Sequence, residues 1–243
     1  MWLCLPTYNE AENIEPMVRR LLEVFASSGT NGHVLVIDDC SPDGTGHVAD
    51  RLAGECSRVT VLHRPGKEGL GPAYRDGFRH ALAAGADLIM EMDCDFSHDP
   101  QDVPRLVEAA ANADVVLGSR YVPGGRVENW GLVRRSISRA GCVYARVALR
   151  VAPHDLTGGF KCFRRRVLVE LPLGEVSSAG YVFQIEMTYR AILQGFTVHE
   201  VPITFHERRA GKSKMSHGIV WEAARKVPRL RRLRRGLTHS SAT

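Results

Sequence analysis

Short apolar runs alternate with helical patterns through the first half of the chain. The runs lie at 34–37, 59–62, 88–90 and 115–117, and the helical patterns at about 11–26, 44–54, 71–84 and 102–111. A short, continuous apolar run is typical of a parallel strand that is buried on both faces. Strands and helices that alternate at this spacing form βαβ units. The sequence therefore predicts an α/β fold with a mostly parallel central sheet and helices on both faces.

The second half of the chain is less regular. Residues 130–150 have a helical pattern with a basic start, and 198–203 form a late candidate strand. No linker, internal repeat or low-complexity segment divides the 243 residues, a length that suits one sizeable core. We therefore expect one domain at 1–215, followed by a tail at 216–243.

The tail is basic and amphipathic. Eleven Lys/Arg residues and one acidic residue lie between Arg208 and Arg235, which leaves 21 basic and 26 acidic residues in the rest of the chain. From Val220 to Leu237, apolar residues recur every three or four positions with arginines between them. This pattern predicts an amphipathic helix, which Pro228 should kink or restart.

The charge asymmetry of the tail indicates an anionic partner such as a membrane surface, phosphates or nucleic acid. The tail has no interleaved aromatic residues and no recognition module, so we do not expect nucleic acid. Two alternatives stay open. The tail helix lies on an anionic membrane, or it packs on the body of the protein.

Neither membrane spanning nor secretion is indicated. No segment approaches the roughly 18 consecutive apolar residues that cross a bilayer, and Met1 to Leu5 are too few for a signal peptide. The six cysteines include no C-x-x-C pair, so neither a zinc site nor a disulfide framework is predicted. The expected compartment is the cytosol.

Acidic residues follow two of the predicted strands. In parallel sheets, ligands bind beyond the carboxyl ends of the strands, and Asp93 and Asp95 lie at such an end. Alternate residues of an extended segment point to the same side, so these carboxylates can converge, with Ser97 one step further. Two carboxylates and a hydroxyl suit a hard cation such as Mg²⁺ or Mn²⁺. A simple strand-end turn is the alternative.

Asp38 and Asp39 form a second acidic strand end. One of these carboxylates could accept hydrogen bonds from a base or from a ribose hydroxyl. The alternative is again a turn, because Ser41-Pro42-Asp43-Gly44 is a strong turn sequence. Two acidic strand ends at one sheet edge favour a nucleoside diphosphate with a metal ion over either feature alone.

Two other nucleotide-binding folds lack their signatures here. A dinucleotide-binding fold needs G-x-G-x-x-G after the first strand, but residues 6–10 contain no glycine. Gly66, Gly69 and Gly71 match neither that fingerprint nor the P-loop. We therefore exclude a Rossmann dehydrogenase and a P-loop kinase.

Nine segments together resemble a known family. They are LPTYNE at 5–10, IDDCSPDGT at 37–45, DCDFSH at 93–98, GSRY at 118–121, ISR at 137–139, DLTGGF at 155–160, GYVFQIEM at 180–187, EVPI at 200–203 and GKSK at 211–214. In this order they resemble family 2 glycosyltransferases of the GT-A fold and, more narrowly, the polyprenol-phosphate (dolichol-phosphate) mannose synthases. The likeness extends to about residue 216.

The resemblance implies roles for particular residues. The guanosine site would be lined by Pro6, Tyr8, Glu10, Ile37 and Asp39. The donor would face Asp93, the backbone of Cys94, and Asp95, with Asp95 and Ser97 on the metal ion. The donor phosphates would be covered by Arg208 and Lys214. The phosphate of a lipid acceptor would be bound by Arg120, Arg134 and Ser138. Cys94 departs from the family, in which alanine is more usual at this position.

The resemblance also implies a reaction, namely inverting transfer of mannose from GDP-mannose to a polyprenyl (dolichyl-type) monophosphate with Mg²⁺ or Mn²⁺. Such an enzyme would be cytoplasmic and peripheral on the inner face of the membrane. A lipid monophosphate is largely ionised at neutral pH, so the acceptor needs no general base. The alternative is transfer of glucose or another hexose to the same lipid or to another acceptor.

Several polar segments keep two interpretations. Arg134, Arg135 and Arg139 belong either to a phosphate site or to a solvated helix face. The triplet 164–166 is either surface charge or faces a membrane. Asp155 and the segment 184–186 either organise the site from below or contact sugar hydroxyls or the acceptor phosphate.

Overall fold

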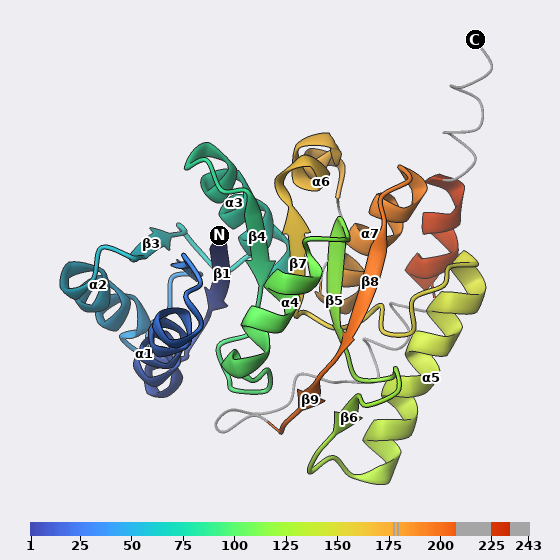
Figure 1. Cartoon of the computed structure of the whole chain (residues 1–243), viewed down its shortest axis with the longest axis horizontal. Coiled ribbons are helices and arrows are strands. Elements are labelled where there is room, and N and C mark those ends of the chain that lie inside the picture. Colours follow the sequence, from blue (N-terminus) through green and yellow to red (C-terminus); the bar gives the residue numbers. More distant parts are fainter. Residues whose placement is uncertain (177, 179, 208–224, 234–243) are drawn as a thin grey trace.

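The computed structural model describes residues 1–176, 178, 180–207 and 225–233, and its centre is a seven-stranded sheet (Figure 1). The strands are β1 (Trp2–Thr7), β2 (His33–Asp38), β3 (Val59–His63), β4 (Leu88–Glu91), β5 (Val115–Ser119), β7 (Lys161–Arg164) and β8 (Val198–Pro202). Their order is β3-β2-β1-β4-β7-β5-β8, and only β7 runs antiparallel to its neighbours. The prediction of a mostly parallel sheet is confirmed. A second, two-stranded sheet pairs β6 (Arg126–Val127) with β9 (Thr204–Phe205).

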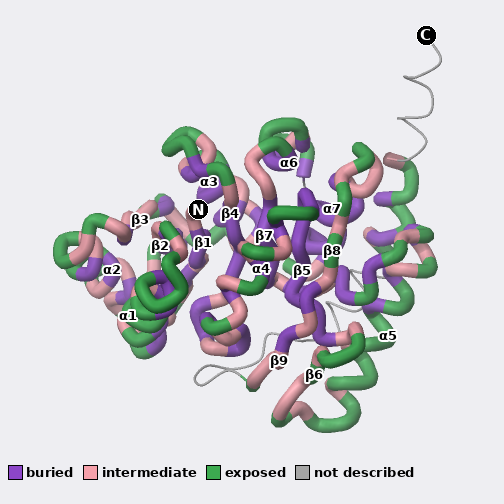
Figure 2. The backbone as a smooth tube through the Cα atoms, in the orientation of Figure 1, coloured by how far each residue is buried: buried purple, intermediate pink, exposed green. Residues whose placement is uncertain are grey.

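Helices cover both faces of the large sheet. One face packs against α1 (Ala11–Ser28), α2 (Thr45–Glu55) and α4 (Val103–Ala109), and the other against α3 (Leu70–Ala83), α6 (Arg165–Glu170) and α7 (Gly180–Leu193). Successive side chains of β1 alternate between the two cores: Leu3 and Leu5 enter one, and Cys4 enters the other. This two-sided burial explains the continuous apolar runs of the sequence, and Figure 2 shows the buried strands between exposed helix faces. Two 3₁₀ turns, Pro100–Asp102 and Leu173–Glu175, complete the regular elements.

A third, smaller core lies at one end of the molecule. There α5 (Leu132–Leu149) lies beside the helix at 225–233 (Figure 1). Val227 and Leu230 of that helix are buried in one cluster with Leu149 of α5 and Tyr189 of α7. The arginines at 225, 229, 231 and 232 are exposed.

The predicted tail is thus described only in part. Over 225–233 its apolar stripe packs on the body of the protein, and Pro228 lies within the helix. The boundary between 215 and 216 lies outside the described residues and stays a prediction. No helix within the described ranges has both the length and the apolar composition needed to cross a membrane.

The order of the strands defines where a ligand can bind. From β1 the chain moves outward to β2 and β3, and then returns to the other side of β1 to form β4. The connections that leave β1 and β4 therefore diverge from neighbouring carboxyl ends. In open parallel sheets, such a switch point is where ligands bind. The segments after β1 and β4 are those predicted above to hold the donor.

Candidate active site

The segment after β4 carries the two carboxylates that the sequence predicted as metal and donor ligands. Cys94 is buried in the core cluster of α1 and α4, and burial raises the pKa of its thiol well above the usual range. Asp95 is also buried, and its Oδ1 accepts a hydrogen bond of 3.0 Å from the backbone N–H of Ser97. Asp93 is half-buried, and its backbone N–H donates to Nδ1 of His98 at 3.3 Å.

The residues of this segment fit a hard divalent cation. The hydroxyl oxygen of Ser97 is buried and has no hydrogen-bond partner among the described residues. Such an orphaned oxygen beside a buried carboxylate suits Mg²⁺ or Mn²⁺, which prefer oxygen ligands. No group of three or more His, Cys, Asp or Glu side chains in the described ranges could hold a metal ion. A cation here would therefore share its ligands between the protein and substrate phosphates, as Mg²⁺ commonly does.

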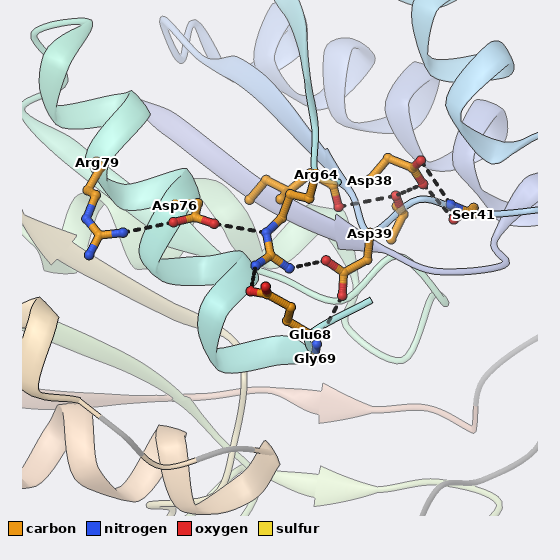
Figure 3. A network of polar contacts seen from close by, with 10 residues as sticks. Asp38, Asp39, Ser41, Arg64, Glu68, Gly69, Asp76 and Arg79 are labelled. Carbon is orange, nitrogen blue, oxygen red and sulfur yellow. Dashed lines mark hydrogen bonds and ion pairs between the residues drawn. The ribbon is translucent and has the colours of Figure 1, made fainter. Parts of the chain in front are cut away.

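At the end of β2, a buried arginine holds Asp39 in place (Figure 3). Arg64 pairs with Asp39 and also with Glu68 at 2.6 Å and Asp76 at 2.9 Å. The other oxygen of Asp39 accepts from the backbone N–H of Gly69 at 3.1 Å. Burial would lower the pKa of Arg64, but its hydrogen bonds to Asp76 and Asp39 raise it overall. The pairing of Arg64 with Asp39 was not predicted from the sequence, because the partners of Arg64 come from three different segments.

The two carboxylates of this strand end have different roles. Asp38 accepts hydrogen bonds from Ser41, at 2.6 Å from the hydroxyl and 3.2 Å from the backbone N–H, and from the hydroxyl of Thr7 at 3.3 Å. Asp38 therefore anchors Ser41, the first residue of the Ser-Pro-Asp-Gly turn that the sequence indicated. Asp39, which is held by Arg64 and Gly69 instead, takes no part in this turn.

The other residues predicted for the guanosine site differ in exposure. Pro6, Tyr8 and Glu10 are partly exposed, and the ammonium of Lys67 lies 3.6 Å from the centre of the Tyr8 ring. The Ile37 side chain is fully buried in the core, so the structure does not bring it to a ligand. A role for that residue would have to use its main chain.

The residues predicted for the acceptor start from a buried ion pair after β5. Arg120 donates from Nε and Nη2 to the two oxygens of Asp155, both at 2.7 Å, and from Nη2 to the hydroxyl of Thr157 at 2.8 Å. Burial would raise the pKa of Asp155, but the charge of Arg120 lowers it overall. For Asp155, this pairing supports the interpretation that it organises the site.

A cavity of about 300 Å³ lies over this ion pair and is lined by arginines. Its lining comprises Arg120, Tyr121, Val122, Pro123, Gly125, Val127, Arg135 and Arg139. The Tyr121 hydroxyl donates to Ser138 at 2.7 Å, so Ser138 adjoins the cavity through Tyr121. Arg134 points elsewhere, since its guanidinium lies 4.0 Å from the Trp130 ring and pairs with Glu207 at 3.1 Å.

The structure thus brings together some of the predicted residues and not others. Arg120 and Ser138 lie at one cavity. Arg135 and Arg139 line this cavity, whereas Arg134 does not. A larger cavity of about 690 Å³ lies between α1 and residues 96–101, and none of the predicted residues lines it. The predicted donor residues Arg208 and Lys214 lie outside the described residues.

Beneath the segment after β4 lies a buried polar layer. Glu91 and Lys161 are paired across β4 and β7, and the Lys161 ammonium donates to the backbone oxygen of Gln184 at 2.7 Å and to Thr188 at 3.0 Å. Burial lowers the pKa of Lys161 to about 8 and raises that of Glu91 to about 7. Glu186 has a structural role, because Arg190 donates to it at 2.8 Å.

Comparisons with known proteins agree with this geometry. The family model described as "Glycosyl transferase family 2" matches residues 2–171. The undecaprenyl-phosphate mannosyltransferase of Micrococcus luteus is 48% identical over 225 residues, which cover 93% of this chain and 91% of that protein. The polyprenol monophosphomannose synthase of Mycolicibacterium smegmatis is also 48% identical, over 92% of this chain and 83% of that protein.

A solved structure shares the fold. Glucosyl-3-phosphoglycerate synthase from Mycobacterium tuberculosis, in complex with Mn²⁺, uridine diphosphate and phosphoglyceric acid, superposes with a TM-score of 0.67 at 19% sequence identity. The match covers 96% of this chain and 77% of that one. The predicted GT-A-type fold class and the resemblance to polyprenol-phosphate mannose synthases are both confirmed. The chain is a glycosyltransferase and belongs to glycosyl transferase family 2.

Proposed function

We propose that this glycosyltransferase transfers mannose from GDP-mannose to a polyprenyl monophosphate. The observation that carries the proposal is the cavity over the Arg120–Asp155 pair, whose described lining has three arginines and no acidic residue. A cavity of this charge suits an anionic acceptor better than a neutral alcohol. The two relatives at 48% identity, which are named for undecaprenyl phosphate and polyprenol, support the same class of acceptor.

The acceptor chemistry follows from the charge of a phosphate monoester. Its second pKa is about 6, so at neutral pH it carries its own nucleophilic oxygen and needs no general base. The planar guanidinium groups of Arg120, Arg135 and Arg139 can bind the remaining oxygens and orient the attack. Val122, Pro123 and Val127 give the same cavity an apolar side, which suits the first carbons of a lipid chain.

The donor would occupy the switch point between β1 and β4. Asp39, held by Arg64, and the partly exposed ring of Tyr8 would bind the nucleoside. Asp95 and Ser97 would hold Mg²⁺ or Mn²⁺. When bound, the cation neutralises charge that develops on the departing nucleoside diphosphate. Arg208 and Lys214 are proposed to add positive charge there. In-line attack from the acceptor cavity inverts the configuration at C1.

The proposed place of action is the surface of an anionic membrane, on its inner face. In support, α5 exposes large apolar side chains, among them Leu132 at 81%, Val133 at 74% and Val147 at 70%. The same helix carries arginines and has no acidic residue. Apolar and cationic side chains on one helix are typical of a segment that binds anionic lipids.

A donor and acceptor panel tests the proposal. Purified protein is incubated with labelled GDP-mannose, GDP-glucose or UDP-glucose, a short polyprenyl phosphate, and Mg²⁺, Mn²⁺ or chelator. We expect a labelled lipid from GDP-mannose only, and only with a divalent cation. A lipid product from UDP-glucose alone would instead support the glucosyl alternative. No lipid product from any donor would refute the proposed function.

Arginine variants of α5 test the acceptor site. Replacing Arg139 with methionine should raise KM for the polyprenyl phosphate roughly tenfold to a hundredfold, because a charge-assisted hydrogen bond is worth about 1.5–3 kcal/mol. KM for GDP-mannose should not change. Arg134→Met is the matched control. It should raise KM for the polyprenyl phosphate less than Arg139→Met does, since Arg134 stacks on Trp130. A larger effect at Arg134 than at Arg139 would mean that the lipid phosphate binds outside this cavity.

A further inference from the structure

The side-chain amide of Gln184 is buried, and among the described residues it makes no hydrogen bond of normal geometry. Gln184 lies near the start of α7 and is 1% exposed. Gln184 interacts weakly with the nearby Glu91 carboxyl and lowers its pKa, yet neither Oε1 nor Nε2 makes a hydrogen bond of normal geometry with any described residue. A buried donor and acceptor that both lack partners destabilise a protein unless a ligand satisfies them.

Beside this amide, Gly159 leaves room for at least a methyl group. A Cβ atom placed on Gly159 would lie 3.5 Å from Nε2 of Gln184 and 3.6 Å from Oδ1 of Asp93. The amide and the carboxylate therefore border one common space. Both distances are ordinary van der Waals contacts, and the backbone of Gly159 is not in the left-handed region. Packing alone would therefore allow alanine at this position.

The amide is held on a fixed support. Lys161 is fully buried, and its ammonium donates to the backbone oxygen of Gln184. The Thr188 hydroxyl donates to the same oxygen at 3.1 Å. The bond from Lys161 holds the backbone of α7 at Gln184 against β7, so the helix position that carries the amide is fixed.

We propose that Gln184 determines which hexose the enzyme accepts, by binding two hydroxyl groups of the donor sugar in the space between Gly159 and Asp93. The inference rests on the proposed function, because it assigns the sugar part of the same donor. One hydroxyl would donate to Oε1, and another would accept from Nε2. A buried amide of this kind rejects a sugar that lacks either hydroxyl, because its own groups are then left unpaired.

The first test combines Gln184→Leu with donors that lack single hydroxyls. GDP-mannose and its 2-, 3-, 4- and 6-deoxy forms are compared by kcat/KM. With the natural protein, kcat/KM for two of the deoxy donors should be lower than that for GDP-mannose by roughly a hundredfold or more. In the leucine variant, kcat/KM for GDP-mannose itself should fall by a similar factor. For the same two deoxy donors, kcat/KM should then be no more than a few-fold below that for GDP-mannose with this variant. Affinity for GDP alone, measured by calorimetry, should be unchanged.

Gly159→Ala provides a second test that leaves Gln184 intact. The added methyl group would occupy the proposed sugar space, so kcat/KM for GDP-mannose should fall at least tenfold while GDP affinity and Tm stay the same. Gly174→Ala is the matched control, because a Cβ there has no atom within 4 Å, and it should be as active as the natural protein.

The outcomes separate this inference from the proposed function. If the natural protein transfers mannose but the leucine variant still depends on every hydroxyl as before, the inference is wrong and the proposed function stands. A leucine variant that only loses thermal stability, together with a fully active Gly159→Ala protein, would also overturn it. If the natural protein transfers glucose instead, the same comparison is made with deoxyglucose donors. If it transfers no sugar, the proposed function fails, and the inference fails with it.

Discussion

Replacing Asp95 with asparagine is expected to lower kcat about a thousandfold while the protein stays folded. A divalent cation stabilises charge on the leaving group by several kcal/mol, and each 1.36 kcal/mol is a factor of ten in rate. Asparagine keeps the size of the side chain and an oxygen that can accept from the backbone N–H of Ser97. It removes only the negative charge that would hold the metal. Initial rates of lipid-linked product at saturating donor and acceptor measure the effect.

A neighbouring acid on the same segment provides the control. Asp99 caps the 3₁₀ turn that follows, where it accepts from the backbone N–H of Gln101 at 2.9 Å. Asparagine caps helices about as well as aspartate, so Asp99→Asn should keep near-normal activity. The metal dependence gives a second criterion: raising Mn²⁺ should restore part of the activity of Asp95→Asn. Full activity of that variant in excess chelator would refute the metal assignment.

Removing the charge of Asp155 is expected to cause the largest loss of stability. Arg120 is 6% exposed, so Asp155→Asn leaves a buried guanidinium without its counter-charge. Breaking a buried ion pair from one side costs about 3–5 kcal/mol. For a chain of this size, each kcal/mol lowers Tm by about 2–4 °C. Calorimetry should therefore show a fall in Tm of roughly 10 °C or more at neutral pH.

Acid should reduce this difference. The pKa of Asp155 is lowered in the folded protein, so its stabilisation is present above the unfolded value, about 4. That stabilisation is lost as the pH falls through the folded value. The gap in Tm between the natural protein and Asp155→Asn should narrow as the pH is lowered from about 4. A gap that stays constant in this range would show that the pair does not stabilise the fold through charge.

A double variant separates stability from function. Arg120→Met/Asp155→Asn removes both charges and keeps an oxygen that can accept from the backbone N–H of Arg120, which now donates to Asp155 at 3.0 Å. Exchanging a buried pair for uncharged groups is often neutral, so most of the lost Tm should return. Transfer to polyprenyl phosphate should not return, because the cavity has lost an arginine. Recovery of both would mean that Arg120 serves the fold alone.

The sequence predicted the positions of strand ends better than the details of the site. The segments after β1, β2 and β4 meet at one sheet edge because parallel strands align their carboxyl ends. The residues alone left the choice between Asp38 and Asp39 open, and only the family resemblance indicated Asp39. The pairing of Asp39 with Arg64 was not predicted, since the other partners of Arg64, Glu68 and Asp76, are up to twelve residues away from it. Strand β7 was missed as well, because its four residues begin and end with a basic side chain.

Helix geometry groups the arginines of α5, but it does not predict which group faces the cavity. Residues four apart lie on one face of a helix, so Arg135 and Arg139 share a face, while Arg134 shares one with Ser138. The structure places the first pair on the cavity and links Ser138 to it through Tyr121. The resemblance to a family indicated which residue types matter. It did not indicate that Arg134 would stack on Trp130, because that contact depends on the loop before the helix.

The reversed direction of β7 has a consequence for how this enzyme can change. Its amino end lies at the same edge as the carboxyl ends of β4 and β5, so the loop that enters it runs between the proposed donor and acceptor sites. That one loop carries Asp155, which holds Arg120 on the proposed acceptor side, and Gly159, which borders Asp93 on the proposed donor side. Insertions or exchanges in these few residues affect both substrates at once. Changes in this loop are therefore expected to alter the donor and acceptor preferences together. A change in one preference alone would have to come from positions farther from the loop.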